Sequence, residues 1–305
     1  MKRLHRKRDA AALSSRLIRR PIQRMVWLFL LPTFAAFCIG FLYPFLKGAF
    51  LSFCKFKLTS QWTWVGFTNY VKAFSDSSFL HAFWYTALFA FVSVLFINVL
   101  AFTVAYFLTK GIKGSNLFRT VFFMPNLIGG IVLGYIWSMI FDGILVKYNT
   151  SVVLESRYGF WGLIILMCWQ QVGYMMIIYI AGLQSVSEDM LEAARIDGAN
   201  GWQILWKITI PTVMPSITIC TFLTLTNSFK LFDQNMVLNE GRPYIFQNGV
   251  QIKTTEMLAL NIYNTFYMNA KSRGVGQAKA VLFFILVAAI ALIQLRATHE
   301  KEVQQ

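Results

Sequence analysis

The sequence predicts an all-α polytopic membrane protein with six transmembrane helices. Of its 305 residues, 57% are hydrophobic and only 13% are charged, whereas soluble domains carry about 25% charged residues. A single soluble core of this length does not need so much apolar surface, so we expect the excess to face lipid. Six segments without a charged residue and a strongly basic N-terminal arm indicate the same class.

Each predicted helix corresponds to one uncharged segment. A helix needs about 20 mostly apolar residues to cross the ~30 Å hydrocarbon core of a bilayer. Five segments meet this length, and the sixth extends back to Gly276 if the ammonium group of Lys279 reaches toward the membrane surface. The segments are 25–46, 82–109, 120–141, 158–187, 208–229 and 280–295.

The basic charge is concentrated at the N-terminus. Residues 1–24 contain nine Lys and Arg against one Asp, which is +8 of the chain's net charge of +15. Trp27 is the first Phe, Tyr or Trp of the chain. A nucleic-acid-binding surface would interleave cations with aromatic residues, so we exclude nucleic acid as a partner. Cations beside a first span hold that flank in the cytoplasm and contact anionic lipid. Six spans then predict a cytoplasmic arm (1–24), a permease domain (25–296) and a short cytoplasmic tail (297–305).

The residues offer no catalytic or metal site. The cysteines have no paired spacing, and the histidines are scattered, so neither a disulfide framework nor a zinc site is expected. No G-x-x-x-x-G-K-[ST] run is present, so the chain cannot bind ATP through a P-loop. Energy for transport must come from another subunit or an ion gradient. The residues concerned are Cys38, Cys54, Cys168, Cys220, His5, His81 and His299.

The loop 184–210, between the fourth and fifth predicted spans, is acidic although the chain is basic. It predicts a short helix, a break and a second short helix. Ser185 and Glu188 have the spacing of a capping box, and Ser187 is a competing N-cap. Gly198 is expected to end the first helix in a left-handed conformation.

This loop resembles the EAA loop in the membrane subunits of ABC importers. E-A-A-x-x-D-G-A is followed at fixed distance by I-T-I-P. Further stretches, including Val65 to Tyr70, Trp169-Gln170 and Leu231 to Asp233, are similar to the carbohydrate, maltose-type branch, whereas Asn239 to Pro243 departs from it. The matching positions of the loop are Glu192, Ala193, Ala194, Asp197, Gly198, Ala199, Ile208 and Pro211.

The resemblance implies a type I permease fold and a set of partners. The chain would pair with a second, homologous permease in the cytoplasmic membrane. Two cytoplasmic ATPase subunits would hold ATP and Mg, and an external solute-binding protein would deliver the carbohydrate. The EAA helix would dock on an ATPase and transmit its closure to the spans as alternating access. This chain would bind no cofactor and would not be an enzyme.

Two polar helix faces are candidates for the translocation path. Amide side chains facing lipid are costly, so these faces should point at protein or water, and neutral amides and an aromatic ring suit a sugar. Interhelical hydrogen bonding is the alternative role for each of them. One face holds Gln170, Gln171 and Tyr174, and the other holds Thr224, Asn227 and Ser228. Lys230 and Asp233, which follow the second face, are expected to form a local ion pair.

Three other functions are alternatives to a carbohydrate importer subunit. An ion-coupled secondary transporter should carry ionisable residues within its spans, and the central segments contain none. A membrane enzyme would need a convergent catalytic set, which is absent from the sequence. An ABC permease for a glycerol phosphate derivative, which some relatives carry, remains an alternative to sugar.

Overall fold

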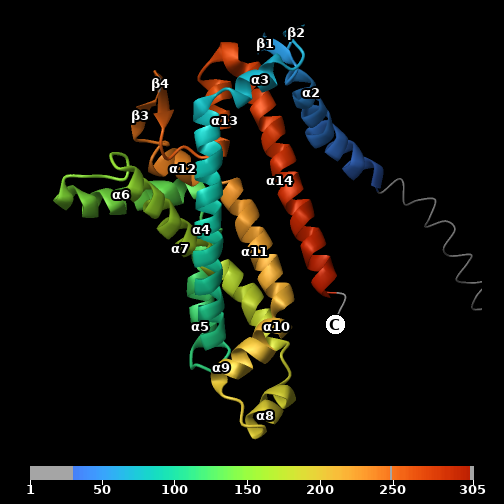
Figure 1. Ribbon diagram of the computed structural model, residues 1–305, viewed down its shortest axis with the longest axis vertical. Helices are drawn as coiled ribbons and strands as arrows, with labels where there is room; N and C mark the ends of the chain where they lie inside the picture. The colour runs from blue at the N-terminus through green and yellow to red at the C-terminus, as the bar shows by residue number, and fades with distance from the viewer. Residues whose placement is uncertain (1–29, 248, 303–305) are drawn as a thin grey trace, which may run out of the picture.

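The computed structural model describes residues 30–247 and 249–302, and it is built around three packed helices. These are α4 (Ser77–Leu108), α7 (Ser156–Gln184) and α11 (Met214–Phe229). The 32 residues of α4 span about 48 Å at ~1.5 Å per residue. This exceeds the ~30 Å of hydrocarbon in a bilayer, and α4 runs along most of the length of the molecule, with α8 and α9 beyond its end (Figure 1).

The number of apolar helices agrees with the sequence prediction at its upper limit. Among the described residues, five helices are long and apolar enough to cross a membrane. A sixth span results when residues 201–212 and 214–229, bent by 69° relative to each other, are counted together. The five are Leu30–Leu51, Ser77–Leu108, Gly130–Tyr148, Ser156–Gln184 and Ala270–Gln294.

The third predicted span is wrong in its boundaries. The segment 120–141 is not one helix, because the chain forms α5 (Ser115–Phe123), a 3₁₀ turn η2 (Met124–Leu127) and then α6 (Gly130–Leu145). Pro125 lies in the 3₁₀ turn and Ile128 is extended, with ψ 132°. Proline has no N–H to continue a helix, so the break follows from the sequence. Beyond it, α6 runs crosswise to α4 (Figure 1).

The fifth predicted span, 208–229, also contains a break. Val213 separates the helical arm 201–212 from α11 at the 69° bend. The arm comprises α9 (Gly201–Ile204), a π-helical turn η4 (Leu205–Thr209) and α10 (Ile210–Thr212). Val213 is 1% exposed, so the bend is packed against the rest of the bundle.

The sixth span is longer than predicted, and its lysine points inward. Helix α14 runs from Arg273 to Glu302, which includes residues 297–302 of the expected tail. Lys279 is fully buried and lies 2.6 Å from the carboxylate of Asp76. The expectation that Lys279 reaches to the membrane surface is therefore wrong. The basic arm 1–24 and residues 303–305 lie outside the described residues.

Two antiparallel hairpins, not expected from the sequence, lie at one end of the bundle (Figure 1). Strand β1 (Cys54–Leu58) pairs with β2 (Gln61–Trp64), with Cys54 opposite Trp64. Strand β3 (Tyr244–Gln247) pairs with β4 (Val250–Lys253), with Tyr244 opposite Lys253. The remaining helical elements are η1 (Cys38–Leu42), α2 (Tyr43–Leu51), α3 (Thr68–Phe74), η3 (Val146–Tyr148), α8 (Glu188–Ile196), α12 (Asp233–Leu238), α13 (Leu258–Tyr267) and η5 (Ala270–Ser272).

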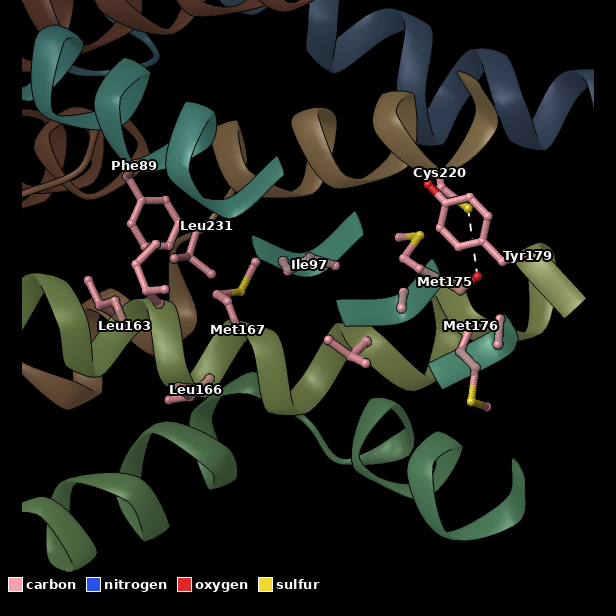
Figure 2. Close-up of a cluster of buried hydrophobic side chains, with 14 of the residues drawn as sticks. Phe89, Ile97, Leu163, Leu166, Met167, Met175, Met176, Tyr179, Cys220 and Leu231 are labelled. Carbon is pink, nitrogen blue, oxygen red and sulfur yellow. Dashed lines mark hydrogen bonds between the residues drawn. The ribbon is translucent and has the colours of Figure 1, made fainter. Parts of the chain in front are cut away.

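The hydrophobic core follows the seam between α4, α7 and α11 (Figure 2). Phe89 and Ile97 from α4 lie over Leu163 and Met167 from α7 in this cluster. Toward the other end of α7, Tyr179 lies beside the thiol of Cys220 from α11 (Figure 2). The core therefore fixes α7 and α11, which carry the candidate polar residues, against α4.

Candidate functional site

The acidic loop forms the end of the molecule opposite the two hairpins (Figure 1). Helix α8 begins after Ser187, whose side chain makes no capping bond. The hydroxyl of Ser185 donates to the carbonyl of Gly182 at 2.7 Å, so the expected capping box of Ser185 with Glu188 is wrong. Glu188 and Asp189 still occupy the first turn, where carboxylates interact favourably with the helix dipole.

The end of α8 at Gly198 is as predicted. Gly198 has φ +81°, and its N–H donates to the carbonyl of Arg195 at 3.1 Å. The N–H of Ala199 donates to the carbonyl of Ala194 at 2.9 Å. Together these bonds form a Schellman motif, which satisfies the last carbonyls of the helix and turns the chain sharply.

A capping box that the sequence analysis missed starts the second short helix. The N–H of Gln203 donates to Oδ1 of Asn200 at 2.9 Å, and the N–H of Asn200 donates to Oε1 of Gln203 at 2.8 Å. The N-x-x-Q spacing was the available signal, since it places an acceptor and a reciprocal amide three residues apart. Trp202 and Trp206 follow on one exposed side, with ring centroids 5.6 Å apart.

The side chains of α8 divide into an anchor and an open face. Leu191 packs against the core cluster, and Val186 just before the helix is buried. Among the resembling positions, Ala194 and Ala199 are half-buried, whereas Glu192, Ala193, Asp197 and Gly198 are exposed. Ile196 is 86% exposed. The loop therefore presents small, acidic and apolar groups away from the bundle while two side chains hold it in place.

The α7 residues of the predicted path point in different directions. Gln170 is half-buried, and its Oε1 accepts a 2.8 Å bond from Nε2 of Gln234 on α12. Gln171 is buried, its Nε2 lies 3.8 Å from the sulfur of Met167, and its Oε1 has no hydrogen-bond partner. Tyr174 is half-buried, with its ring 6.5 Å from that of Phe123. Gln234 was missed because it lies just beyond the fifth predicted span, 208–229.

The α11 residues of the predicted path also separate. Thr224 and Ser228 are fully buried, and their hydroxyls donate to the helix's own carbonyls of Cys220 and Thr224 at 2.7 and 2.8 Å. Asn227, which lies between them in the sequence, is exposed. The structure thus places Thr224 and Ser228 in helix packing and leaves Asn227 accessible.

Two residues that sequence reasoning missed connect the three helices. The hydroxyl of Tyr179 on α7 donates to Oδ1 of Asn98 on α4 at 2.7 Å. The amide of Asn98 lies 3.4 Å from the hydroxyl of Thr224 on α11. A lone amide within the apolar segment 82–109 was the signal for Asn98, because such a group needs a partner inside a membrane protein. Tyr179, Asn98 and Thr224 thus form a hydrogen-bonded cluster between helices. Interhelical hydrogen bonding is the role given above for Thr224 as the alternative to lining the path.

The expected ion pair after α11 does not form. The salt bridges among the described residues do not include Lys230 with Asp233, and Lys230 is exposed. Asp233 instead lies against α6, since a Cβ on Gly130 would be 2.9 Å from its Cβ. Within residues 30–247 and 249–302, no group of three His, Cys, Asp or Glu is placed to hold a metal ion.

Comparison with known proteins identifies the class of the chain. Residues 97–299 match the family described as binding-protein-dependent transport system inner membrane component. The chain is 39% identical over 286 residues to the probable starch degradation products transport system permease protein AmyD of Thermoanaerobacterium thermosulfurigenes, covering 91% of this chain and 95% of the relative. It is 28% identical over 287 residues to the multiple sugar-binding transport system permease protein MsmF of Streptococcus mutans, covering 91% and 96%.

A solved structure shows the same fold. A bacterial ABC transporter that imports the acidic polysaccharide alginate superimposes with a TM-score of 0.75 at 20% identity, covering 93% of this chain and 98% of that one. These likenesses favour the binding-protein-dependent class over an ion-coupled secondary transporter or a membrane enzyme. The chain belongs to the family of inner membrane components of binding-protein-dependent transport systems.

Proposed function

We propose that this chain is one permease half of an ATP-driven importer that carries a carbohydrate across the cytoplasmic membrane. The observation that carries the proposal is α8, an exposed helix at one end of the bundle, joined through a packed bend to the helix that holds Asn227. Such a connection suits a subunit that receives motion from a partner. In this arrangement both termini lie in the cytoplasm with α8, and the hairpins lie outside.

The coupling role rests on the shape and chemistry of the loop. We assign the contact with an ATPase to six positions, of which Glu192, Ala193, Asp197 and Gly198 are exposed. Small alanine side chains allow close approach of a partner, and the carboxylates offer charge to it. The six positions are Glu192, Ala193, Ala194, Asp197, Gly198 and Ala199.

The substrate path rests on the polar faces of α7 and α11. The accessible groups are Asn227, the half-buried ring of Tyr174 and the Gln170 amide that is paired with Gln234. Gln171, Thr224 and Ser228 are buried behind them, where they shape the faces by packing. All of the candidate side chains are neutral, which suits sugar hydroxyls better than a phosphate, whose recognition uses charge-assisted bonds.

The partners follow from the family. A binding-protein-dependent system supplies an external solute-binding protein, and this chain lacks a P-loop. We therefore assign ATP and Mg to two separate ATPase subunits and the other half of the pathway to a second, homologous permease. This chain contributes a membrane pathway and no catalytic chemistry.

Reconstituted uptake tests the proposal. The complex of this chain with its genomic neighbours is placed in liposomes, and uptake of radiolabelled maltotriose or glycerol 3-phosphate is measured. We expect uptake of maltotriose that requires ATP inside and the solute-binding protein outside. ATP-independent uptake would contradict the importer assignment, and uptake of glycerol 3-phosphate alone would contradict the carbohydrate assignment.

A further inference from the structure

Lys279 is a fully buried cation in the last helix, and three oxygen atoms surround it. Its Nζ donates to Oδ2 of Asp76 at 2.6 Å, to Oδ1 of Asn261 at 2.8 Å and to Oγ1 of Thr265 at 2.8 Å. A lysine ammonium has three donors, so all of them are used. Asp76 is the residue before α4, and Asn261 and Thr265 both lie in helix α13, so these bonds join α14 to two other parts of the chain.

Asn261 extends this arrangement to a second buried charge. While its Oδ1 accepts from Lys279, its Nδ2 donates to Oε2 of Glu256 at 2.7 Å. Glu256 is 4% exposed, and its other oxygen accepts from Asn264. The orientation of the Asn261 amide is therefore fixed by a cation on one side and an anion on the other. We call Asp76, Lys279, Asn261 and Glu256 the outer lock.

The outer lock includes Glu256, and residues 254–258 around it are bonded to α4 and lead into α13. Residues 254–258 bond to α4 through Nε2 of His81 with the carbonyl of Thr254 at 2.9 Å, and through the N–H of Leu258 with Oγ1 of Thr86 at 2.8 Å. The same segment follows β4 directly, and a Cβ on Gly241 would lie 2.9 Å from Cβ of Glu256. The position of the β3–β4 hairpin is thus set from residues 254–258.

The geometry argues against a role in ion transport. A buried ionisable group in a membrane protein is by default a functional candidate. Here the cation is saturated by three acceptors, and its counter-ion Asp76 also accepts from the N–H of Ser78 at 2.9 Å, which caps α4. Because the bonds of Lys279 and Asp76 join α14 to α13 and to the start of α4, these two residues hold the three helices in fixed relative positions. The Lys279 side chain is fully buried, whereas that of Asp76 is 31% exposed, so removing Asp76 would leave a buried ammonium without its counter-ion, which is strongly destabilising locally.

We propose that Lys279 is a positioning residue that fixes the β3–β4 hairpin and residues 254–258 to the ends of α4 and α14, so that they move as one unit. This inference rests on the proposed function: a loaded solute-binding protein contacts this unit on the outer side of the membrane. The outer lock then transmits the resulting displacement to α4 and α14. Lys279 acts through Asp76 and Asn261 and does not touch the substrate.

The test uses the complete importer with Lys279→Met. We measure ATPase activity without and with the solute-binding protein and maltotriose. We expect near-normal basal ATPase activity and a ratio of stimulated to basal activity that falls about fivefold or more, within the range of ordinary allosteric coupling. Lys47→Met is the matched control, since Lys47 is an exposed lysine in the first span, and its ratio should stay unchanged. A normal ratio in Lys279→Met would overturn the proposal.

Hydrogen–deuterium exchange on the same complexes separates positioning from general destabilisation. We expect faster exchange confined to residues 239–258 and the start of α13, with α8 unchanged. Faster exchange throughout, including α8, would overturn the proposal, as would no change. If Lys279→Met does not assemble, Asp76→Asn decides, because asparagine keeps one oxygen for the cap of α4, whereas its NH₂ group carries no charge and cannot accept from the Lys279 ammonium. If the solute-binding protein and maltotriose do not stimulate the ATPase activity of the wild-type complex, the proposed function fails. The exchange result still tests whether Lys279 positions residues 239–258.

Discussion

The carbonyl oxygen of Phe122 lies where a side chain on Gly173 would have to be. A Cβ built on Gly173 would be 1.8 Å from this oxygen and 2.2 Å from the carbonyl carbon. Helix α7 therefore touches the backbone at the end of α5 directly. This contact sets the start of the chain's turn from α5 through Pro125 to the crosswise helix α6.

Gly173→Ala should destabilise the protein because backbone atoms must move to admit the methyl group. We expect a loss of about 1–3 kcal/mol or more, as for overpacked cores, seen as a lower thermal unfolding temperature of the purified complex. Gly143→Ala in α6 is the control, since a Cβ there meets nothing within 4 Å. It should be neutral or slightly stabilising, because alanine favours a helix over glycine. Equal unfolding temperatures for the two variants would contradict the close contact.

Gly198→Ala should weaken coupling without affecting insertion. The left-handed conformation of Gly198, φ +81°, costs a residue with a Cβ about 1–2 kcal/mol. Alanine at this position therefore strains the turn after α8. Gly198→Asp adds a charge at the same exposed point and should abolish uptake. Gly201→Ala is matched, since Gly201 has no such φ and no atom near its Cβ position. Uptake and membrane abundance are measured together, and normal uptake by Gly198→Asp would remove the coupling role.

Asn227→Leu and Thr224→Val distinguish the path from packing. Asn227 is exposed, so its loss should raise KM for maltotriose uptake while the ATPase subunits still co-purify. Thr224 is buried and bonded within its own helix and to Asn98, so its loss should lower thermal stability with KM unchanged. Failure of Asn227→Leu to assemble would favour a packing role for that residue too.

Tyr179→Phe should loosen the seam between α4 and α7. The change removes the 2.7 Å bond to Asn98 and leaves Oδ1 of the half-buried Asn98 short of a donor. The loss should approach the cost of about 1–3 kcal/mol for an unpaired group in a fully buried site. Thermal unfolding of the complex measures this loss. The exposed Tyr267→Phe serves as control. An unfolding temperature of Tyr179→Phe that equals wild type would show that the cluster contributes nothing to stability.

Cys54 should react slowly with maleimide. Cys54 is the first residue of β1 and its side chain is fully buried, and burial raises the pKa of its thiol. Because the thiolate is the reacting form, a raised pKa lowers the reactive fraction at any pH below it, and labelling should still be rising at a pH where an ordinary thiol has levelled off. Ser60→Cys, at the exposed hairpin turn, provides the comparison in a background where the other cysteines are serine. Equal labelling rates would contradict the buried position.

The sequence predicts what depends on local chemistry. Gly198 ends α8 because the chain needs a left-handed residue there, and the apolar segments form the helices because lipid or core must cover them. It does not predict the direction of a side chain that has two acceptable environments. Lys279 could reach water or an acid, and only the approach of Asp76, about 200 residues away in the sequence, decides between them.

In the candidate site, too, local spacing is predictable from the sequence, whereas contacts between distant segments are not. Polar residues spaced three and four apart do share a helix face, but which neighbour covers that face depends on crossing helices. Thr224 meets Asn98, whereas Asn227 on the same helix stays exposed. Gln234 becomes a partner of Gln170 only because α12 folds back beside α7. Hairpins β1–β2 and β3–β4 escaped prediction because their short strands lie outside the apolar segments.

The bend at Val213 has a mechanical consequence. A Cβ on Gly182, near the end of α7, would lie 2.3 Å from Oγ of Ser216 and 3.1 Å from Cγ1 of Val213. The bend at Val213 is thus closely packed against α7. We expect the arm 201–212 and α11 to move together, so that a sideways displacement of the arm tilts α11 about the contact at Gly182.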